Sequence, residues 1–202
     1  MREMSKQMPE QGLLLILSGP SGVGKGAVGA LLLADNPNLV YSVSTTTRTP
    51  RPGERHGANY YFVSREQFTA AIREGDFLEW AEVYGNYYGT RRSAVLENLR
   101  QGKDLILEID TQGARQIKTA CPSSISIFIK PPSLAELERR IVSRGSENAE
   151  SLARRLSAAK EEMSRAGEYD YVVVNDEVER AAKEIESIIR AEKTFKPRKE
   201  QE

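Results

Sequence analysis

The chain has 202 residues, of which 39% are apolar and 29% charged, an ordinary balance for a globular protein. At roughly 100–200 residues per domain, this length predicts one domain, or one with small insertions. The 29 basic and 29 acidic residues cancel, so no general attraction to nucleic acid or acidic membranes is expected. A single cysteine, Cys121, excludes an intrachain disulfide, and a Ser-His-Asp hydrolase would have to be built around the only histidine, His56.

The first residues, Met1 to Gln11, mix both signs of charge and contain no secretory apolar segment. The apolar run Leu13 to Leu17 is far shorter than the roughly 20 residues that span a bilayer. We therefore expect a cytoplasmic protein, monomeric or homodimeric, without a nucleic-acid or membrane partner.

A buried strand followed by a phosphate-binding loop is predicted next. Gly12 to Ser18 contains a continuous apolar run, as in a strand covered on both faces of a parallel sheet. Gly19 to Lys25 then fits G-x-x-x-x-G-K, and a helix is predicted from Lys25 to Ala34. A glycine-rich turn with a solvated lysine is the alternative, which the strand–loop–helix context disfavours. The predicted nucleotide-binding residues are Gly19, Pro20, Ser21, Gly22, Val23, Gly24, Lys25, Gly26 and Ala27.

One position departs from this motif. The Ser or Thr expected after the lysine, whose hydroxyl reaches Mg²⁺, is replaced by Gly26, and Ala27 follows. Ser18 and Ser21 are nearby hydroxyls at other positions. We expect Mg²⁺ to be held by water, nucleotide oxygens and a carboxylate, since this ion needs few protein ligands.

The segment 45–90 interrupts the alternation of strands and helices. A short strand candidate, Tyr41–Ser44, precedes it, and within it strand candidates at Tyr60–Val63 and Phe77–Val83 flank a predicted helix from Arg65 to Glu74. We predict a small mixed α/β insertion over residues 45–90. Polar and charged candidates gather in this region, and a solvated loop explains their spacing equally well: Ser44, Arg48, Arg51, Tyr60, Glu79, Tyr88 and Thr90.

The chemistry of these residues suits a nucleotide base and its phosphate. Arginine binds phosphate through bidentate, charge-assisted hydrogen bonds. A carboxylate matches the adjacent N1–H and N2–H₂ donors of guanine, and a hydroxyl can serve its O6. Adenine would leave a buried carboxylate unpaired, which can discriminate by orders of magnitude. Glu79 with Ser44 could therefore select guanine.

Three more strands are predicted at Leu105–Asp110, Ser124–Ile129 and Tyr171–Val174, separated by helical stretches. This alternation predicts an α/β fold with a parallel sheet covered by helices. Glu108 and Asp110 are two residues apart on the first of these strands, so both are expected on one face. Two carboxylates on a buried strand predict a site for metal, base or ribose.

Two further helices follow Pro131-Pro132. Ser133 to Glu136 fits a capping box, and a second helix is predicted from Asn148 to Ala166. Arg140 and Arg144 are four residues apart and face the same way, whereas Arg155 lies on the second helix. Surface arginines of this kind are usually solvated or paired with glutamates.

Four motifs together resemble the guanylate kinase family over about Gly12 to Lys193. They are residues 18–25 (SGPSGVGK), 44–54 (STTTRTPRPGE), 85–90 (GNYYGT) and 173–176 (VVND). The second and third are specific to that family, whereas the first is shared by many nucleotide-binding proteins.

This resemblance implies ATP-dependent phosphorylation of GMP, and of dGMP, with Mg²⁺. It implies a P-loop core (1–44, 91–132 and 168–202), a GMP-binding insertion (45–90) and a helical lid with its adjoining helix (133–167). Arg48, Arg51, Tyr60 and Tyr88 would hold the GMP phosphate, and Ser44, Glu79 and Thr90 the guanine, with Glu108 and Asp110 nearby. Lys25, Arg48, Arg140, Arg144 and Arg155 would be catalytic, and Asn175 would lie near ATP.

Three rival functions share parts of this pattern. A non-catalytic guanylate-kinase-like interaction module is favoured only by Gly26-Ala27, while Lys25 and the lid arginines oppose it. A signalling GTPase would need an N-K-x-D motif, which the sequence lacks. A kinase for AMP or UMP is disfavoured by Glu79 and the segment 44–54.

Overall fold

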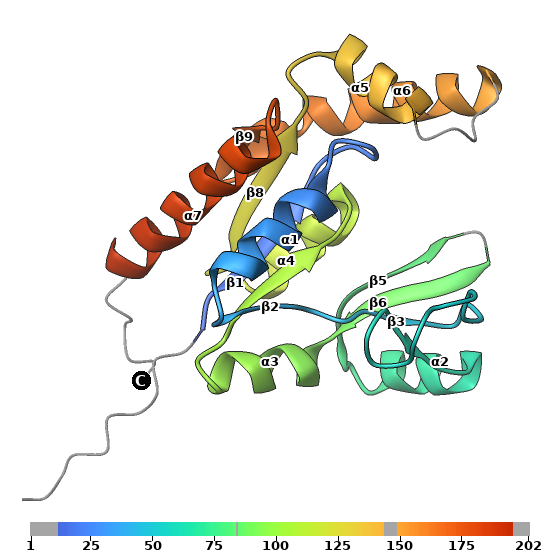
Figure 1. Ribbon diagram of the computed structural model, residues 1–202. Helices are drawn as coiled ribbons and strands as arrows, with labels where there is room; N and C mark the ends of the chain where they lie inside the picture. Colours follow the sequence, from blue (N-terminus) through green and yellow to red (C-terminus); the bar gives the residue numbers. More distant parts are fainter. Residues whose placement is uncertain (1–11, 84, 144–148, 196–202) are drawn as a thin grey trace, which may run out of the picture.

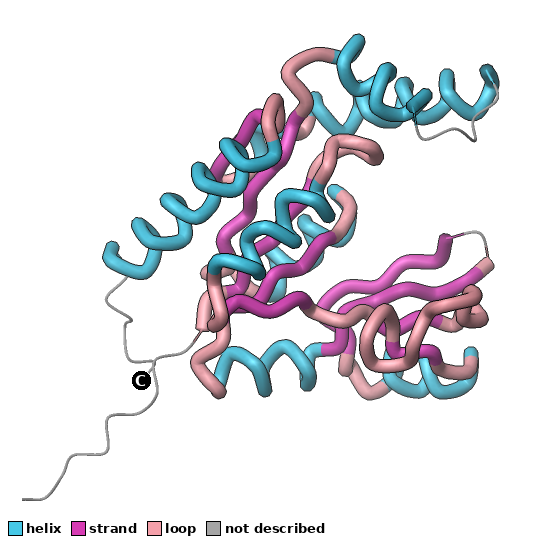
Figure 2. The backbone as a smooth tube through the Cα atoms, viewed as in Figure 1, coloured by secondary structure: helices cyan, strands magenta, loops and turns pink. Residues whose placement is uncertain are grey.

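A computed structural model describes residues 12–83, 85–143 and 149–195. Its first sheet has five parallel strands in the order β2-β7-β1-β8-β9. Helices lie on both sides of this sheet (Figures 1 and 2). The predicted parallel α/β core is therefore confirmed. The strands are β1 (Leu14–Ser18), β2 (Leu39–Tyr41), β7 (Asp104–Glu108), β8 (Ile125–Lys130) and β9 (Tyr171–Val174).

The apolar residues of β1 explain why helices cover both faces of the sheet. Leu15 and Leu17 belong to one buried cluster with α1 (Lys25–Asp35) and α7 (Val178–Phe195). Leu14 and Ile16 point the other way, toward α3 (Arg92–Arg100) and α4 (Thr111–Ala120). Because side chains alternate along a strand, a continuous apolar run serves both faces.

A second sheet has four strands in the order β4-β3-β6-β5. It pairs β3 with β4 in parallel and is otherwise antiparallel, and α2 (Arg65–Arg73) packs beside it through Phe68. Ser64 and Gln67 form a complete capping box at the start of α2, which the sequence analysis missed. The strands are β3 (Thr45–Thr46), β4 (Tyr61–Phe62), β5 (Phe77–Val83) and β6 (Asn86–Arg91).

The predicted strand Tyr41–Ser44 is wrong in its bounds. The chain leaves the first sheet after Tyr41 and enters the second at Thr45, so Ser44 lies in the connection between two sheets. The strands predicted at Phe77–Val83 and Tyr171–Val174 are confirmed at the same bounds. The division into a GMP-binding insertion and a lid stays a prediction.

Two helices lie beyond β8 in Figure 1, α5 (Leu134–Ser143) and α6 (Ala149–Ser164), followed by the short 3₁₀ helix η1 (Ala166–Glu168). Only half of the predicted capping box is present at α5. The Glu136 N–H donates to Ser133 Oγ (3.1 Å), but its carboxylate accepts from Arg139 and Arg140 instead. No helix among the described residues is both long and apolar enough to span a bilayer.

Candidate active site

The P-loop, residues 19–25, joins β1 to α1 in the predicted way. Gly19, Gly22 and Gly24 have φ angles of +143°, +88° and +101°, which favour glycine. Gly24 is the N-cap of α1, with no side-chain cap and no acidic residue in the first turn of the helix. The first N–H groups of α1 are thus left for an anionic ligand.

Lys25 is folded back onto the loop. Its Nζ donates to the Gly19 carbonyl (2.6 Å) and the Pro20 carbonyl (3.3 Å). Burial lowers the pKa of Lys25, whereas the negative charges of Glu108, Glu162 and Asp110 raise it by less. A desolvated cation whose hydrogen bonds go to carbonyl groups is well placed to exchange them for phosphate oxygens.

Asn175 supports the loop from the end of β9. The side chain is 1% exposed, and its Nδ2 donates to the Val23 carbonyl at 2.7 Å. A Cβ at Gly24 would lie 2.5 Å from this nitrogen, so the close approach requires glycine. Asn175 therefore does more than end a strand: it sets the conformation of the P-loop.

Two predicted arginines reach the P-loop from α5 and α6. Arg140 donates to the carbonyls of Val23 (3.3 Å) and Asn175 (3.0 Å). Arg155 donates to Ser21 Oγ at 2.7 Å. Both are thus next to the expected phosphate position, whereas Arg144 lies outside the described residues.

Glu79 is a buried carboxylate on β5. It is 8% exposed and accepts a hydrogen bond from Thr90 Oγ1 (2.6 Å). Thr90 is the residue paired with Glu79 on the neighbouring strand β6. Burial raises the pKa of Glu79, and the nearby Asp110 raises it further. The predicted pair of Glu79 and Thr90 is thus brought together. Ser44 is half-buried, and its carbonyl accepts from the Tyr61 N–H (2.8 Å).

The arginine-rich connection after β3 is organised by Glu54. Its carboxylate accepts two hydrogen bonds from the Arg48 guanidinium (3.0 and 2.9 Å) and one from the Arg51 N–H (2.7 Å). The Arg48 guanidinium also lies 5.5 Å from the ring centroid of Tyr60, and the Tyr60 and Tyr88 rings are 6.0 Å apart. The four predicted phosphate ligands therefore lie in one region, with Arg51 exposed.

The prediction of two carboxylates on a buried strand is wrong. Glu108 is the exposed last residue of β7, and Asp110 lies beyond the strand as the N-cap of α4, accepting from the Gly113 N–H (2.8 Å). Short polar residues favour such caps, which explains Asp110 without a ligand. Glu108 faces the position of the missing P-loop hydroxyl, since a Cβ at Gly26 would lie 3.8 Å from Glu108 Oε2.

Comparison with known proteins decides the family. The family model described as "Guanylate kinase" matches residues 11–192. The guanylate kinase of Clostridioides difficile (strain 630) is 50% identical, with 91% of this chain and 90% of that protein covered. The Nostoc sp. protein of that name is 55% identical over 90% and 92%. The chain belongs to the guanylate kinase family.

A solved structure agrees with this assignment. The crystal structure of guanylate kinase from Anaplasma phagocytophilum superposes with a TM-score of 0.74 at 39% identity, covering 94% of this chain and 90% of that one. The two chains thus share the guanylate kinase fold over nearly their whole length.

Two residues of this family member, Glu54 and Glu162, were missed from sequence. Glu54 stands inside the quoted 44–54 motif, and its spacing from Arg48 and Arg51 was the available signal. Glu162 on α6 has a buried Oε2 without a hydrogen-bond partner among the described residues, and it acts electrostatically on Lys25. No motif marks it, because α6 meets the P-loop only in the folded chain.

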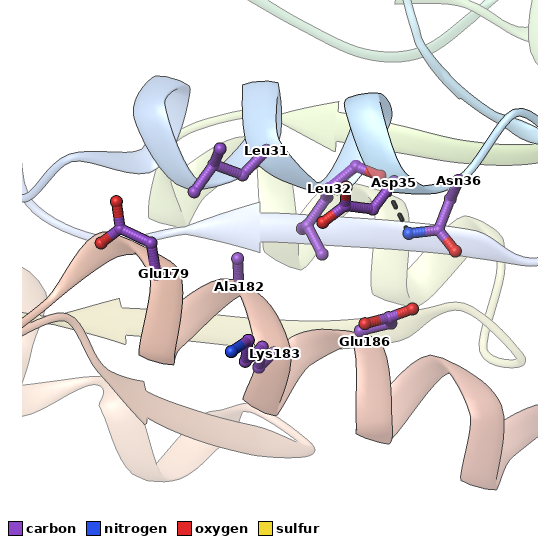
Figure 3. A pocket seen from close by; sticks show the side chains of 8 residues that line it. All are labelled: Leu31, Leu32, Asp35, Asn36, Glu179, Ala182, Lys183 and Glu186. Atoms are coloured by element: carbon purple, nitrogen blue, oxygen red, sulfur yellow. Dashed lines mark hydrogen bonds between the residues drawn. The ribbon is translucent and has the colours of Figure 1, made fainter.

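A separate pocket of about 140 Å³ lies between α1 and α7. Figure 3 shows its lining, with the Asn36 amide bonded to the Leu32 carbonyl at one end. None of the predicted site residues lines it, so it is separate from the predicted nucleotide site.

Proposed function

We propose that this protein transfers the γ-phosphoryl group of ATP to GMP, forming ADP and GDP. Membership of the guanylate kinase family supports this reaction. The observation that carries it is Glu79, a buried carboxylate with a hydrogen bond from Thr90 and no ion pair in the described part of the chain. Such a group is costly without further donors, and guanine supplies two.

Glu79 reads the base in this proposal. Its carboxylate accepts from N1–H and N2–H₂ of guanine, while Thr90 orients it and Ser44 addresses O6. Adenine has no 2-amino group and presents a lone pair at N1, so it would leave the carboxylate unpaired. Deoxyguanylate carries the same base edge and is accepted too.

The phosphates of ATP and the phosphate of GMP are held by different parts of the chain. The P-loop N–H groups and Lys25 bind the β- and γ-phosphates of ATP. Arg48 and Arg51, with the hydroxyls of Tyr60 and Tyr88, bind the GMP phosphate. Because Glu54 and the ring of Tyr60 already orient Arg48, little side-chain entropy is lost on binding.

An oxygen of the GMP phosphate attacks the γ-phosphorus in line. The new O–P bond forms as the bond to the β–γ bridging oxygen breaks, and ADP leaves with that electron pair. The GMP phosphate is already anionic, so no general base is needed. Arg140 and Arg155 approach the transferring group from α5 and α6 and offset the charge that builds on it.

The residues present fit a magnesium ion that is carried mainly by the nucleotide. Among the described residues no group of three or more His, Cys, Asp or Glu side chains could hold a metal, but Mg²⁺ needs only one or two carboxylates. Glu108, opposite Gly26, would supply one of them. When bound, Mg²⁺ neutralises charge on the β- and γ-phosphates.

We further infer a cytoplasmic enzyme, monomeric or homodimeric, that acts on free nucleotides. A coupled assay of ADP production, with Mg²⁺-ATP and GMP, AMP, UMP or CMP as separate acceptors, tests the proposal. Turnover with GMP alone is expected. GMP binding without turnover would overturn the proposal in favour of an interaction module, and turnover with another acceptor would overturn the role of Glu79.

A further inference from the structure

Helix α4 holds the strand that carries Glu79. The strand β5 is at the edge of the second sheet, so half of its backbone groups have no strand partner. The side-chain amide of Gln116, on α4, takes the place of that partner at Trp80. Gln116 Oε1 accepts from the Trp80 N–H (3.3 Å), and Gln116 Nε2 donates to the Trp80 carbonyl (3.4 Å).

Gly113, one turn earlier on α4, lies against the Glu79 carboxylate itself. A Cβ added there would lie 3.2 Å from Glu79 Oε2 and 3.5 Å from Asp110 Oδ1. Gly113 is not among the glycines with positive φ, so its helical backbone does not require glycine. Alanine would favour the helix. Clearance for the carboxylate is therefore the physical reason for a glycine at this position.

We propose that Gln116 and Gly113 are positioning residues for guanine selection. Gln116 holds β5 at a fixed position against α4 through its hydrogen bonds to Trp80, the residue after Glu79. Gly113 leaves the space in which the Glu79 carboxylate turns toward the base. This inference rests on the proposed role of Glu79. It assigns part of the base specificity to a helix that packs on the first sheet, outside the predicted insertion.

Three substitutions at Gln116 and Gly113 should change the position of Glu79. Gln116→Ala removes both hydrogen bonds to the Trp80 backbone. Gln116→Glu keeps the size and the acceptor but loses the donor, and it sets a carboxylate against the Trp80 carbonyl. Gly113→Ala moves the Glu79 carboxylate by a few tenths of an ångström while favouring the helix. A purely structural role would change the melting temperature without changing discrimination between bases.

The experiment compares GMP with IMP, which lacks the 2-amino group. For Gln116→Ala we expect a roughly 3- to 10-fold higher KM for GMP, the worth of about one hydrogen bond, and a similar fall in the ratio of kcat/KM for GMP to that for IMP. The KM for ATP should not change. Fluorescence of Trp80, the only tryptophan, gives an independent GMP titration.

Matched controls separate position from folding. Gln101→Ala removes another amide at a helix end, bonded to Glu97 (2.7 Å), and should leave the KM for GMP and the GMP/IMP ratio unchanged. Gly113→Ala should lower the GMP/IMP ratio without lowering the melting temperature. A GMP/IMP ratio that stays at the wild-type value in Gln116→Ala, Gln116→Glu and Gly113→Ala would overturn the inference.

Failure of the inference and failure of the proposed function give different results. Loss of discrimination in Glu79→Gln together with wild-type discrimination in the α4 variants overturns only the role of α4. Wild-type protein that does not phosphorylate GMP, or does not prefer it to IMP, overturns the role of Glu79 and with it this inference.

Discussion

Lys25 and Glu79 are charged side chains whose burial opposes their ionisation. Burial lowers the pKa of Lys25 and raises the pKa of Glu79. Among the described residues, Lys25 donates hydrogen bonds to two carbonyl groups and Glu79 accepts one from a hydroxyl, and neither forms an ion pair, although a buried structural charge would normally have a closely bonded counter-ion. We therefore expect a bound ligand to supply the missing partner of each side chain: a phosphate anion for Lys25 and N–H donors for Glu79.

Replacing Lys25 tests the donor side of the site. For Lys25→Ala we expect kcat to fall by about 10² to 10³ or more, the usual effect of removing one group that stabilises transition-state charge. GMP affinity should stay within about twofold, because the lysine lies on the P-loop and not beside Glu79. Stopped assays and a calorimetric GMP titration measure the two effects, and Lys160→Ala, on the exposed surface of α6, is the control. Undiminished turnover would remove Lys25 from the mechanism.

Glu79→Gln tests the acceptor side. The amide presents a donor toward N1–H of guanine, so GMP should bind at least about 10² weaker, as when a buried polar group is left unpaired. Binding of ATP should be unchanged. Equal losses for the two nucleotides in titration calorimetry would contradict base reading by Glu79.

The same substitution tests how the ionisation of Glu79 makes the stability of the protein depend on pH. Because the folded pKa of Glu79 is raised, its contribution to stability is fully present below the unfolded pKa and is lost as pH rises through the folded pKa. The melting temperature of ligand-free Glu79→Gln minus that of the wild-type protein should therefore rise as pH increases. Differential scanning calorimetry from pH 4.5 to 8 measures this, and a constant difference across that range would contradict it.

On α5 and on α6, two adjacent arginines lie on different faces of the helix and make different contacts. Arg139 and Arg140 both bond to Glu136 and lower its pKa to about 2, yet only Arg140 also reaches the P-loop. On α6, Arg154 is exposed, whereas its neighbour Arg155 contacts Ser21. Adjacent residues on a helix point about 100° apart, so neighbours of one type can have different roles.

The neighbouring arginines of α6 form a matched pair for mutation. Arg155→Ala should lower kcat by about 10-fold or more, because a charge beside the transferring phosphoryl group is lost. Arg154→Ala should leave kcat within about twofold, since a solvated surface charge contributes little. Steady-state kinetics at saturating GMP measures both, and equal losses would mean that α6 does not approach ATP in the assumed orientation.

In the molecule as a whole, the second sheet has a small core of its own. Phe68, Ala71 and Phe77 form a buried cluster separate from the two clusters that cover the first sheet. The rings of Phe68 and Phe77 stack at a centroid distance of 4.3 Å. A small cluster resists local opening less than a large one, so the second sheet should exchange its amide hydrogens first.

Two core substitutions test this division of the molecule. Phe68→Ala and Ile127→Ala, both at 0% exposed positions, should each cost about 2–5 kcal/mol. Hydrogen exchange in Phe68→Ala should rise mainly within 45–91, with binding of ATP retained and that of GMP lost. In Ile127→Ala exchange should rise throughout the chain. A uniform increase in both variants would contradict separate cores.

The sequence by itself determined the features that rest on local pattern. The apolar run ending at Ser18, the glycine spacing before Lys25 and the strand Tyr171–Val174 are properties of neighbouring residues, and all were predicted correctly. The motifs at 44–54 and 85–90 also identified the family. Periodicity and turn chemistry act within a few residues, so they can be seen without a fold.

Only the tertiary structure decided which distant groups meet. Asn175 lies 152 residues from the Val23 carbonyl that it bonds, and Arg155 lies 134 from Ser21. The exposed positions of Glu108 and Asp110 were mispredicted because burial depends on where β7 ends relative to α4, not on strand periodicity. Gln116 carries no motif, because its partner is the backbone of an edge strand and backbone groups leave no trace in sequence.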